Sequence, residues 1–329
     1  MWNKAKSIRY IFSIAVCICV CLTGCGSDAN ALLDTQISMP VQLSSDNQQK
    51  VYQQEYLSKD VCVVPQNANS ATDAALTAAS VLLVNDNTQE LLFAQNAHEK
   101  RYPASITKIV TALLVLKQGN LDDLVTISYD ASHITEYGAK LCGFQEGDQI
   151  SLRDLLHCLL IYSGNDAGVA IAEHMAGSVE AFADLMNQEM KKLGASSTHF
   201  VNPHGLHDDK QYTSAYDLYL VFHELLQYEL FCEIIQMSEY MASWTDAAGV
   251  THDLLMETTD KYLTDAVDTP EGLTILGGKT GTTIKAGSCL ILYSQDSEYN
   301  NYISVILKAD SSASLYTQMN HLLGYVKRG

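Results

Sequence analysis

Two pairs of short apolar runs, one early and one late in the chain, predict β-hairpins. The first pair covers residues 80–84 and 90–95, and the polar residues 85–88 between them give the turn signal. The second pair covers residues 288–293 and 302–308, again with a polar turn between the runs. Strands are therefore expected near both ends of the folded region.

Between and after these hairpins, apolar residues recur with helical spacing. The run 106–116 is apolar on nearly every face and ends before Gly119, which predicts a buried central helix. Ser151, followed three residues later by Asp154, resembles a capping box that opens the next helix, and Gly194 ends an amphipathic one. Helices are predicted in this way at residues 106–116, 152–162, 167–175, 178–193 and 311–326.

Strands at both ends with helices between them indicate an α/β fold of the α+β type. We expect a five-stranded antiparallel sheet built by both ends of the chain and flanked by N- and C-terminal helices. A helical subdomain, at about residues 120–265, would be inserted between the edges of this sheet. Residues 74–329 suit one such domain with its insert, and no second domain is expected after it.

The first 24 residues have the pattern of an export signal. Residues 1–9 carry three positive charges and no acid, and the apolar run 10–22 is too short for a permanent membrane-spanning helix. Residues 22–25, Leu-Thr-Gly-Cys, resemble the lipobox of bacterial lipoproteins. Cys25 is therefore expected to carry lipid and to anchor the exported protein on the outer face of the cytoplasmic membrane, facing the cell wall. A plain signal peptide with a chance cysteine is the alternative.

Residues 25–73 are expected to form a flexible tether. Ser, Asn, Gln and Asp dominate this segment, and large apolar residues are few. The triplet Ser45-Asp46-Asn47 in it resembles a catalytic motif, but a flexible segment cannot position a side chain. The folded domain is therefore expected to begin at about residue 74.

The chain is strongly acidic. Its formal charge is −18, and the loss of Lys4, Lys6 and Arg9 with the signal would leave −21. Such a charge argues against nucleic acid as a partner and against binding anionic lipid through a basic surface. Five cysteines without lipid would remain, an odd number with no zinc-binding spacing, so neither an essential disulfide nor a metal site is expected.

Three short motifs follow one another in the predicted domain and together outline a serine acyl-transfer site. Ser105-Ile-Thr-Lys108 is the one Ser-x-x-Lys in the chain, and Lys279-Thr280-Gly281 is the one Lys-Thr-Gly. Ser163-Gly-Asn165 lies between them. Each motif alone is a weak signal, but their order and spacing match a known trio.

Ser105 and Lys108 are expected to form a nucleophile and its base. Pro103 disfavours helix before it, so Ser105 would lie at a helix start, where free backbone N–H groups favour negative charge. Lys108 would lie one turn later on the same face, where desolvation lowers the pKa of a lysine toward that of a useful base. The alternative is a buried lysine neutralised by an acid, but no acid lies within four residues.

The other two motifs are expected to hold the substrate. Ser163 and Asn165 would lie in a loop between two apolar helices, where the hydroxyl can relay a proton and the amide can hold a carbonyl. Residues 276–282 are expected to form a strand at an inner edge, with which an extended peptide could pair. Lys279 and Thr280 would bind the terminal carboxylate of that peptide. A phosphate-binding loop is disfavoured, because its spacing and following helix are missing.

These residues resemble the serine D-alanyl-D-alanine carboxypeptidases, the low-molecular-mass penicillin-binding proteins of peptidase family S11, with their β-lactamase/transpeptidase-like fold. The similarity covers residues 79 to about 309. It extends beyond the trio to blocks at residues 102–108, 155–167, 200–206, 214–218 and 278–281, the last together with Ala286-Gly287.

The resemblance implies a role for each motif residue. Ser105 would be the acylated nucleophile, Lys108 its proton acceptor and Ser163 the proton relay. The substrate-binding residues would be Asn165, Lys279, Thr280, Gly281 and Thr282, with the N–H groups of Ser105 and Thr282 as the oxyanion hole. The implied reaction removes the terminal D-alanine from peptidoglycan stem peptides without a cofactor, and β-lactams would bind covalently.

Several alternatives remain beside this activity. A class A β-lactamase needs a glutamate to activate water, and residues 194–211 contain none. A DD-endopeptidase would differ only in the acceptor side of the cleft, and a sensor would bind β-lactams or peptides without turnover. His204 and His207 could suggest a base or a metal pair, but Asn202-Pro203-His204-Gly205 is better explained as a turn.

Overall fold

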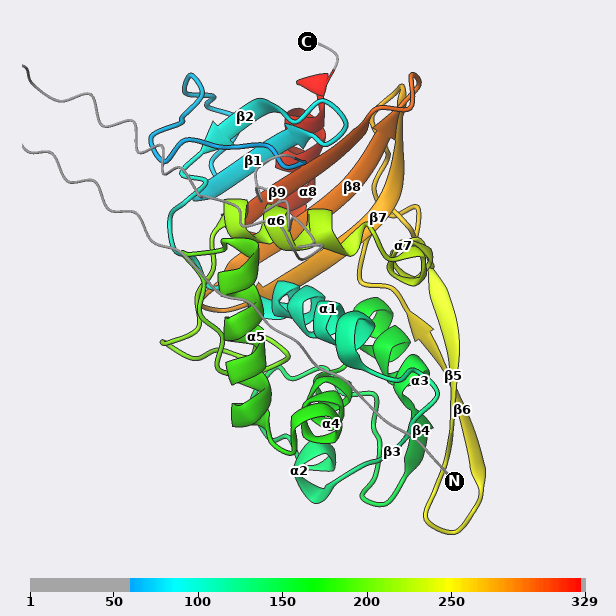
Figure 1. Cartoon of the computed structure of the whole chain (residues 1–329). Helices are drawn as coiled ribbons and strands as arrows, with labels where there is room; N and C mark the ends of the chain where they lie inside the picture. Colours follow the sequence, from blue (N-terminus) through cyan, green and yellow to red (C-terminus); the bar gives the residue numbers. More distant parts are fainter. Residues whose placement is uncertain (1–59, 327–329) are drawn as a thin grey trace, which may run out of the picture. The chain divides into compact units, whose positions relative to one another are not determined.

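The computed structural model describes residues 60–326 (Figure 1). The predicted export signal, the predicted lipidation site Cys25 and residues 26–59 of the predicted tether lie outside this range. None of the helices in the described range combines the length and the apolar character needed to cross a membrane.

A five-stranded antiparallel sheet joins the two ends of the described chain, as predicted (Figure 1). In spatial order its strands are β2 (Glu90–Gln95), β1 (Ser80–Asn85), β9 (Asn301–Ala309), β8 (Gly287–Asp296) and β7 (Leu273–Thr283). Both predicted hairpins, β1–β2 and β8–β9, are confirmed. Strand β1 also pairs with β9 over its whole length, from Ser80 opposite Leu307 to Asn85 opposite Tyr302.

Helices cover both faces of this sheet. Leu82 and Val84 of β1 belong to the larger core, which includes α1 (Lys108–Gln118) and α6 (Ala215–Leu225). Val81 and Leu83 belong to the smaller core, on the side of α8 (Ser312–Leu323). This alternation along one strand buries both faces, and it makes α1 the central helix that its apolar sequence predicted.

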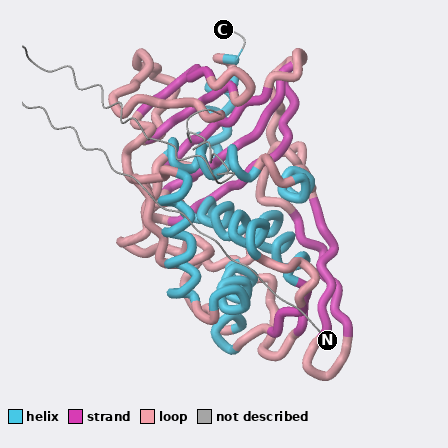
Figure 2. Tube along the Cα trace, viewed as in Figure 1, coloured by secondary structure: helices cyan, strands magenta, loops and turns pink. Residues whose placement is uncertain are grey.

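The insert between β2 and β7 contains helices and a second sheet (Figure 2). Its remaining helices are α2 (Tyr129–Ser132), α3 (Leu152–His157), α4 (Asn165–Ala176), α5 (Val179–Leu193) and α7 (Glu229–Ile235). The second sheet has the order β3 (Leu124–Thr126), β4 (Gln149–Ser151), β5 (Glu239–Thr245) and β6 (Thr251–Glu257).

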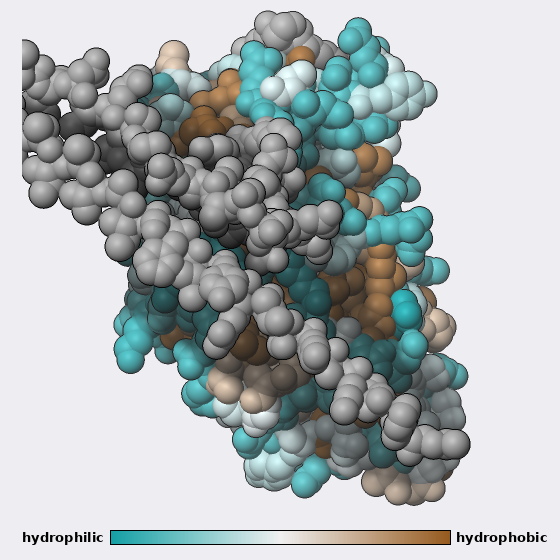
Figure 3. Space-filling model, in the orientation of Figure 1, coloured by the Kyte–Doolittle hydropathy of each residue, from teal (hydrophilic) through white to brown (hydrophobic). Residues whose placement is uncertain are grey.

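The sequence analysis did not predict this second sheet. Strands β3 and β4 are three residues long, and every residue of β6 except Met256 is exposed, so no apolar alternation marks these strands. The β5–β6 hairpin also carries four exposed apolar side chains, those of Met241, Val250, Leu254 and Leu255. On the face seen in Figure 3, hydrophobic patches lie between larger hydrophilic areas.

The predicted helix 152–162 changes its type halfway. It begins as α3, with the Ser151 side chain accepting a hydrogen bond from Asp154 N, and Cys158–Tyr162 continue as a π-helical turn. Ser163 ends this turn with a left-handed φ of 71°. Single π-helical turns often occur at functional sites, because they re-aim the residues that follow.

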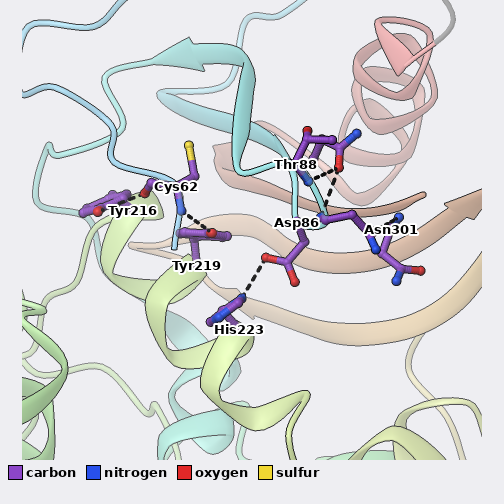
Figure 4. A network of polar contacts seen from close by, with 9 residues as sticks. Cys62, Asp86, Thr88, Tyr216, Tyr219, His223 and Asn301 are labelled. Atoms are coloured by element: carbon purple, nitrogen blue, oxygen red, sulfur yellow. Dashed lines mark hydrogen bonds and ion pairs between the residues drawn. The ribbon is translucent and has the colours of Figure 1, made fainter. Parts of the chain in front are cut away.

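Residues 60–73 were predicted to belong to the flexible tether, but they pack against the folded domain. Cys62 and Val64 are 2% and 4% exposed. The Tyr219 hydroxyl of α6 accepts a hydrogen bond from Cys62 N at 2.8 Å, and the Tyr216 hydroxyl donates one to Cys62 O at 3.1 Å (Figure 4). The folded domain therefore begins before the predicted boundary at residue 74. Local composition could not show this, because the contacts come from a helix that is distant in the sequence.

Helix α6 is also tied to the turn after β1. His223 Nδ1 lies 2.8 Å from Asp86 Oδ1, and both side chains are largely buried (Figure 4). The hydrogen bond to Asp86 raises the pKa of His223 above its usual value. The pair therefore stabilises the contact between α6 and the sheet while the imidazole is protonated.

Candidate active site

Ser105 lies in the 3₁₀ turn Ala104–Thr107 that leads into α1, as the position of Pro103 indicated. Its side chain is partly exposed. Ala104 just before it has a φ of 47°, a strained conformation for a residue other than glycine. Gly205 packs against this turn so closely that a Cβ there would lie 1.8 Å from Ala104 O. The neighbouring loop therefore holds the serine turn in a fixed shape.

Lys108 lies one turn after the serine and is fully buried. Its Nζ lies 3.1 Å from Ser105 Oγ, 2.7 Å from Asn165 Oδ1 and 2.6 Å from the backbone oxygen of His204. All three contacts are with neutral groups. The alternative of a lysine neutralised by a hydrogen-bonded acid is therefore not what the structure shows.

The burial of Lys108 changes its acidity. Desolvation lowers the pKa of its ammonium well below the usual value, and the charge of Lys279 lowers it further. Asp166 opposes this shift but does not reverse it. A serine hydroxyl beside a lysine that readily loses its proton is the pair that nucleophilic acyl transfer needs.

Ser163 faces a second buried lysine. Lys279 Nζ donates a hydrogen bond to Ser163 Oγ at 3.1 Å and another to Thr280 O at 3.1 Å. Burial, and then the charge of Lys140, lower the pKa of Lys279 to about 7. Lys279 can therefore hold or release a proton near neutral pH, and Ser163 is its hydroxyl partner.

Strand β7 brings the Lys-Thr-Gly motif against the serine turn. It forms one edge of the five-stranded sheet, as the glycine-rich sequence predicted. A Cβ on Gly281 would lie 2.9 Å from both Ser105 N and Ile106 N, so a larger residue would push strand and turn apart. The Thr280 hydroxyl lies 2.5 Å from the Thr259 hydroxyl, and Thr282 is exposed at the end of the strand.

The structure thus brings the three sequence motifs into one site. Ser105, Lys108 and Asn165 form one hydrogen-bonded group, and Ser163 and Lys279 form another. Ser163 and Asn165 belong to the same short connection between two helices, which joins the groups. The sheet edge offers Thr280, Gly281 and Thr282 beside them.

Sequence reasoning missed several neighbours of this site, two of which lie close to its lysines. The first is the backbone oxygen of His204, which accepts from Lys108 and carries no residue-type signal. The second is Asp260, which is 2% exposed and has one carboxylate oxygen without a hydrogen bond partner among the described residues. Burial raises the pKa of Asp260 to about 6, and Lys279 opposes that rise.

The His204 side chain belongs to a turn. Asn202 Oδ1 accepts a hydrogen bond from Gly205 N at 2.8 Å, and His204 Nδ1 accepts one from Leu206 N at 3.2 Å. Burial, and then Lys108, lower the pKa of His204 to about 3, so its ring is neutral. Within residues 60–326, no group of three or more His, Cys, Asp or Glu side chains is arranged to hold a metal ion.

Comparison with known proteins places the chain in a family. The family model described as D-alanyl-D-alanine carboxypeptidase matches residues 67–311. The D-alanyl-D-alanine carboxypeptidase DacF of Bacillus subtilis is 32% identical over 268 residues. This match covers 79% of the present chain and 64% of DacF, so the chain corresponds to somewhat less than two thirds of that relative.

Solved structures agree with this placement. The Streptomyces K15 DD-transpeptidase superposes with a TM-score of 0.72 at 25% identity, covering 79% of this chain and 100% of that one. Penicillin binding protein 6B from Escherichia coli superposes with a TM-score of 0.67 at 30% identity, covering 79% and 80% of the two chains. The chain belongs to the D-alanyl-D-alanine carboxypeptidase family, peptidase family S11.

Proposed function

We propose that this protein is a serine D-alanyl-D-alanine carboxypeptidase that removes the terminal D-alanine from peptidoglycan stem peptides. The observation that carries the proposal is the contact of Lys108 Nζ with Ser105 Oγ in a site where the lysine is fully buried. Family membership supports the same reaction. A protein that only captured peptides would not need a buried lysine beside its serine.

The first half of the reaction acylates Ser105. Lys108 Nζ takes the hydroxyl proton while Ser105 Oγ attacks the carbonyl carbon of the D-Ala-D-Ala peptide bond. The carbonyl electron pair moves to its oxygen, where the N–H groups of Ser105 and Thr282 would stabilise the charge. When the C–N bond breaks, the Ser163 hydroxyl passes the proton from the lysine to the departing amine. Free D-alanine leaves, and an ester on Ser105 remains.

The second half returns the enzyme to its starting state. A water molecule attacks the ester carbonyl and gives a proton to Lys108, and the bond to Ser105 Oγ then breaks. Lys108 returns this proton to Ser105 Oγ, and the shortened peptide leaves as a carboxylate whose acid proton passes through solvent to the amine of the released D-alanine. Atoms and charges balance over both halves without a cofactor.

Substrate binding is assigned to the motif residues around this pair. The peptide would lie extended along the edge of β7, held by backbone pairing at Gly281 and Thr282. Asn165 would hold a substrate carbonyl, and Lys279 with the Thr280 hydroxyl would bind the free terminal carboxylate. The contact between Thr259 and Thr280 supports this assignment, because it orients that hydroxyl.

Mass spectrometry of a soluble stem pentapeptide incubated with the purified protein tests the proposal. Loss of one D-alanine is expected, and the Ser105→Ala variant should show none. A folded wild-type protein that forms a penicillin adduct but releases no D-alanine would exclude the carboxypeptidase and favour an endopeptidase or a sensor. A cross-linked peptide dimer offered to the same protein would then separate those two.

The proposal for the localisation of the protein rests on its N-terminal sequence. We propose that the protein is exported and held by lipid on Cys25 at the outer face of the cytoplasmic membrane. The Cys25→Ala variant, expressed in a bacterial host, should move from the membrane fraction to the soluble exported fraction. Unchanged fractionation would contradict the lipid anchor.

A further inference from the structure

Lys140 lies directly beside the Ser163–Asn165 loop. Its backbone oxygen accepts a hydrogen bond from Asn165 N at 2.8 Å. Its Nζ lies 3.9 Å from the centre of the Tyr162 ring, the residue just before Ser163. Gly143 N also donates to Asp166 Oδ2 at 2.9 Å, so the segment that carries Lys140 is held at both ends. The ammonium therefore has a defined position at the rim of the active site.

In the described part of the chain, no polar partner contacts this ammonium. It makes no hydrogen bond or ion pair with any residue between 60 and 326, although its side chain is partly buried. Desolvation lowers the pKa of Lys140. The attraction between the ammonium and the Tyr162 ring compensates only part of the free energy lost with hydration. A partly buried cation with an open coordination shell can bind an anion at little additional desolvation cost.

The charges that face Lys140 leave its positive field largely intact. The positive charge of Lys140 lowers the pKa of both Lys108 and Lys279. The facing acid is Glu257, which is exposed on β6, and Cys142 is a neutral thiol because its pKa is raised well above the usual value. A chain with a formal charge of −18 thus gathers three lysines at its active site.

We propose that Lys140 binds a carboxylate on the acyl-donor peptide, at the residue that precedes D-Ala-D-Ala, and so selects acidic peptides. The inference rests on the proposed carboxypeptidase reaction and adds a specificity determinant to it. Lys279 and Thr280 are assigned to the terminal carboxylate, so Lys140 is available for a different carboxylate. Asn165 is assigned to a substrate carbonyl and borders Lys140, so a carboxylate close to that carbonyl, away from the free terminus, would lie beside Lys140.

Lys140 is not proposed as a base. Ser105 Oγ is already in contact with Lys108, and the Lys140 ammonium is engaged with the Tyr162 ring. The effect of Lys140 is therefore expected in KM more than in kcat, because a carboxylate remote from the reacting bond is held equally in ground state and transition state.

A matched pair of peptides tests the proposal. Acetyl-Glu-D-Ala-D-Ala and acetyl-Gln-D-Ala-D-Ala differ in one negative charge and almost nothing else. The wild-type protein should show about a fivefold higher kcat/KM for the Glu peptide, mainly through KM. In Lys140→Met this ratio should fall to about 1, and Lys140→Arg should keep most of it. High ionic strength should weaken the preference in the wild type.

Binding measured without turnover separates this proposal from the proposed function. Calorimetric titration of both peptides into the Ser105→Ala protein, with and without Lys140→Met, gives the preference directly. If the wild type hydrolyses neither peptide, the carboxypeptidase fails, while a charge preference lost in Lys140→Met would still support the carboxylate site. Equal affinity for both peptides, or a preference unchanged in Lys140→Met, would overturn the proposed carboxylate site. Thermal unfolding of each variant identifies a loss caused by misfolding.

Discussion

Lys108 Nζ lies within 3.1 Å of Ser105 Oγ while the lysine side chain has no exposed surface. This relationship joins a serine hydroxyl that substrate can reach to a base that is shielded from bulk water. A lysine in water at neutral pH is protonated and cannot accept a proton. Burial removes that obstacle, and the charge of Lys279 adds to its effect, so the serine is activated without a hydrogen-bonded acid beside the lysine.

Replacing Lys108 should stop acylation. In Lys108→Gln, the amide cannot accept the Ser105 proton, so the rate of acylation by benzylpenicillin should fall by roughly 10²–10⁴-fold. Stopped-flow or gel-based detection of a fluorescent penicillin adduct measures this rate. Lys191→Gln, at an exposed lysine on α5, is the control and should acylate normally. An acylation rate within threefold of wild type in Lys108→Gln would contradict the assigned role.

The pKa of Lys279 predicts how activity changes with pH. Because that pKa is lowered to about 7, the ammonium that would bind the terminal carboxylate is present below pH 7 and lost above it. For a stem peptide, kcat/KM should therefore fall by up to about tenfold per pH unit above pH 7. The bound carboxylate favours the protonated lysine, so kcat should fall at higher pH than kcat/KM. A kcat/KM that keeps rising to pH 9 would contradict this assignment.

Gly281 should be intolerant of a side chain. A methyl group in Gly281→Ala would meet the backbone nitrogens of Ser105 and Ile106 at 2.9 Å and separate strand β7 from the serine turn. Acylation should fall about 100-fold, since small misplacements near reacting atoms are costly. Thr274→Ala, at an exposed position of the same strand, is the matched control. Equal acylation rates in the two variants would show that the close approach is unimportant.

The ion pair between His223 and Asp86 should make stability depend on pH. The folded-state pKa of His223 is raised, so its contribution is fully present below about pH 6.5 and is lost as the pH rises through the raised value. His223→Gln should therefore lower Tm by about 2–4 °C more at pH 5.5 than at pH 8.5. Scanning calorimetry at both values measures this difference. The same loss at both pH values would show that packing, not charge, is responsible.

The penicillin adduct should be long-lived. Residues 194–211 contain no glutamate, the residue that class A β-lactamases use to activate the deacylating water. Intact-protein mass spectrometry after removal of free benzylpenicillin should show the adduct on Ser105 for many minutes. Regeneration of free protein within seconds, with hydrolysed penicillin in solution, would identify a β-lactamase instead.

Local signals account for what could be predicted from the sequence. Both hairpins, the central helix and the edge strand carry apolar patterns or turn residues, and the structure confirms them. The motif trio could be assembled because each motif is made of side chains with recognisable chemistry.

The remaining features arise from contacts between distant segments. Strand β6 is exposed, and the His204 oxygen belongs to the backbone, so neither leaves a residue-type signal. Cys62 is buried by Tyr216 and Tyr219, more than 150 positions away, and the local sequence around it resembles a tether. Asp260 resembles any surface acid in the sequence, although its carboxylate is buried beside a lysine.

The pairing of β1 with β9 has a consequence for when the candidate active site can assemble. Ser80 pairs with Leu307, so the central sheet cannot close until nearly the whole chain has emerged. Contacts of such high sequence separation form slowly and late in folding. A nascent chain that does not yet include β9 therefore has Ser105 without the complete sheet that places Lys279 beside Ser163. The topology thereby makes assembly of the candidate site depend on the last strand of the sheet.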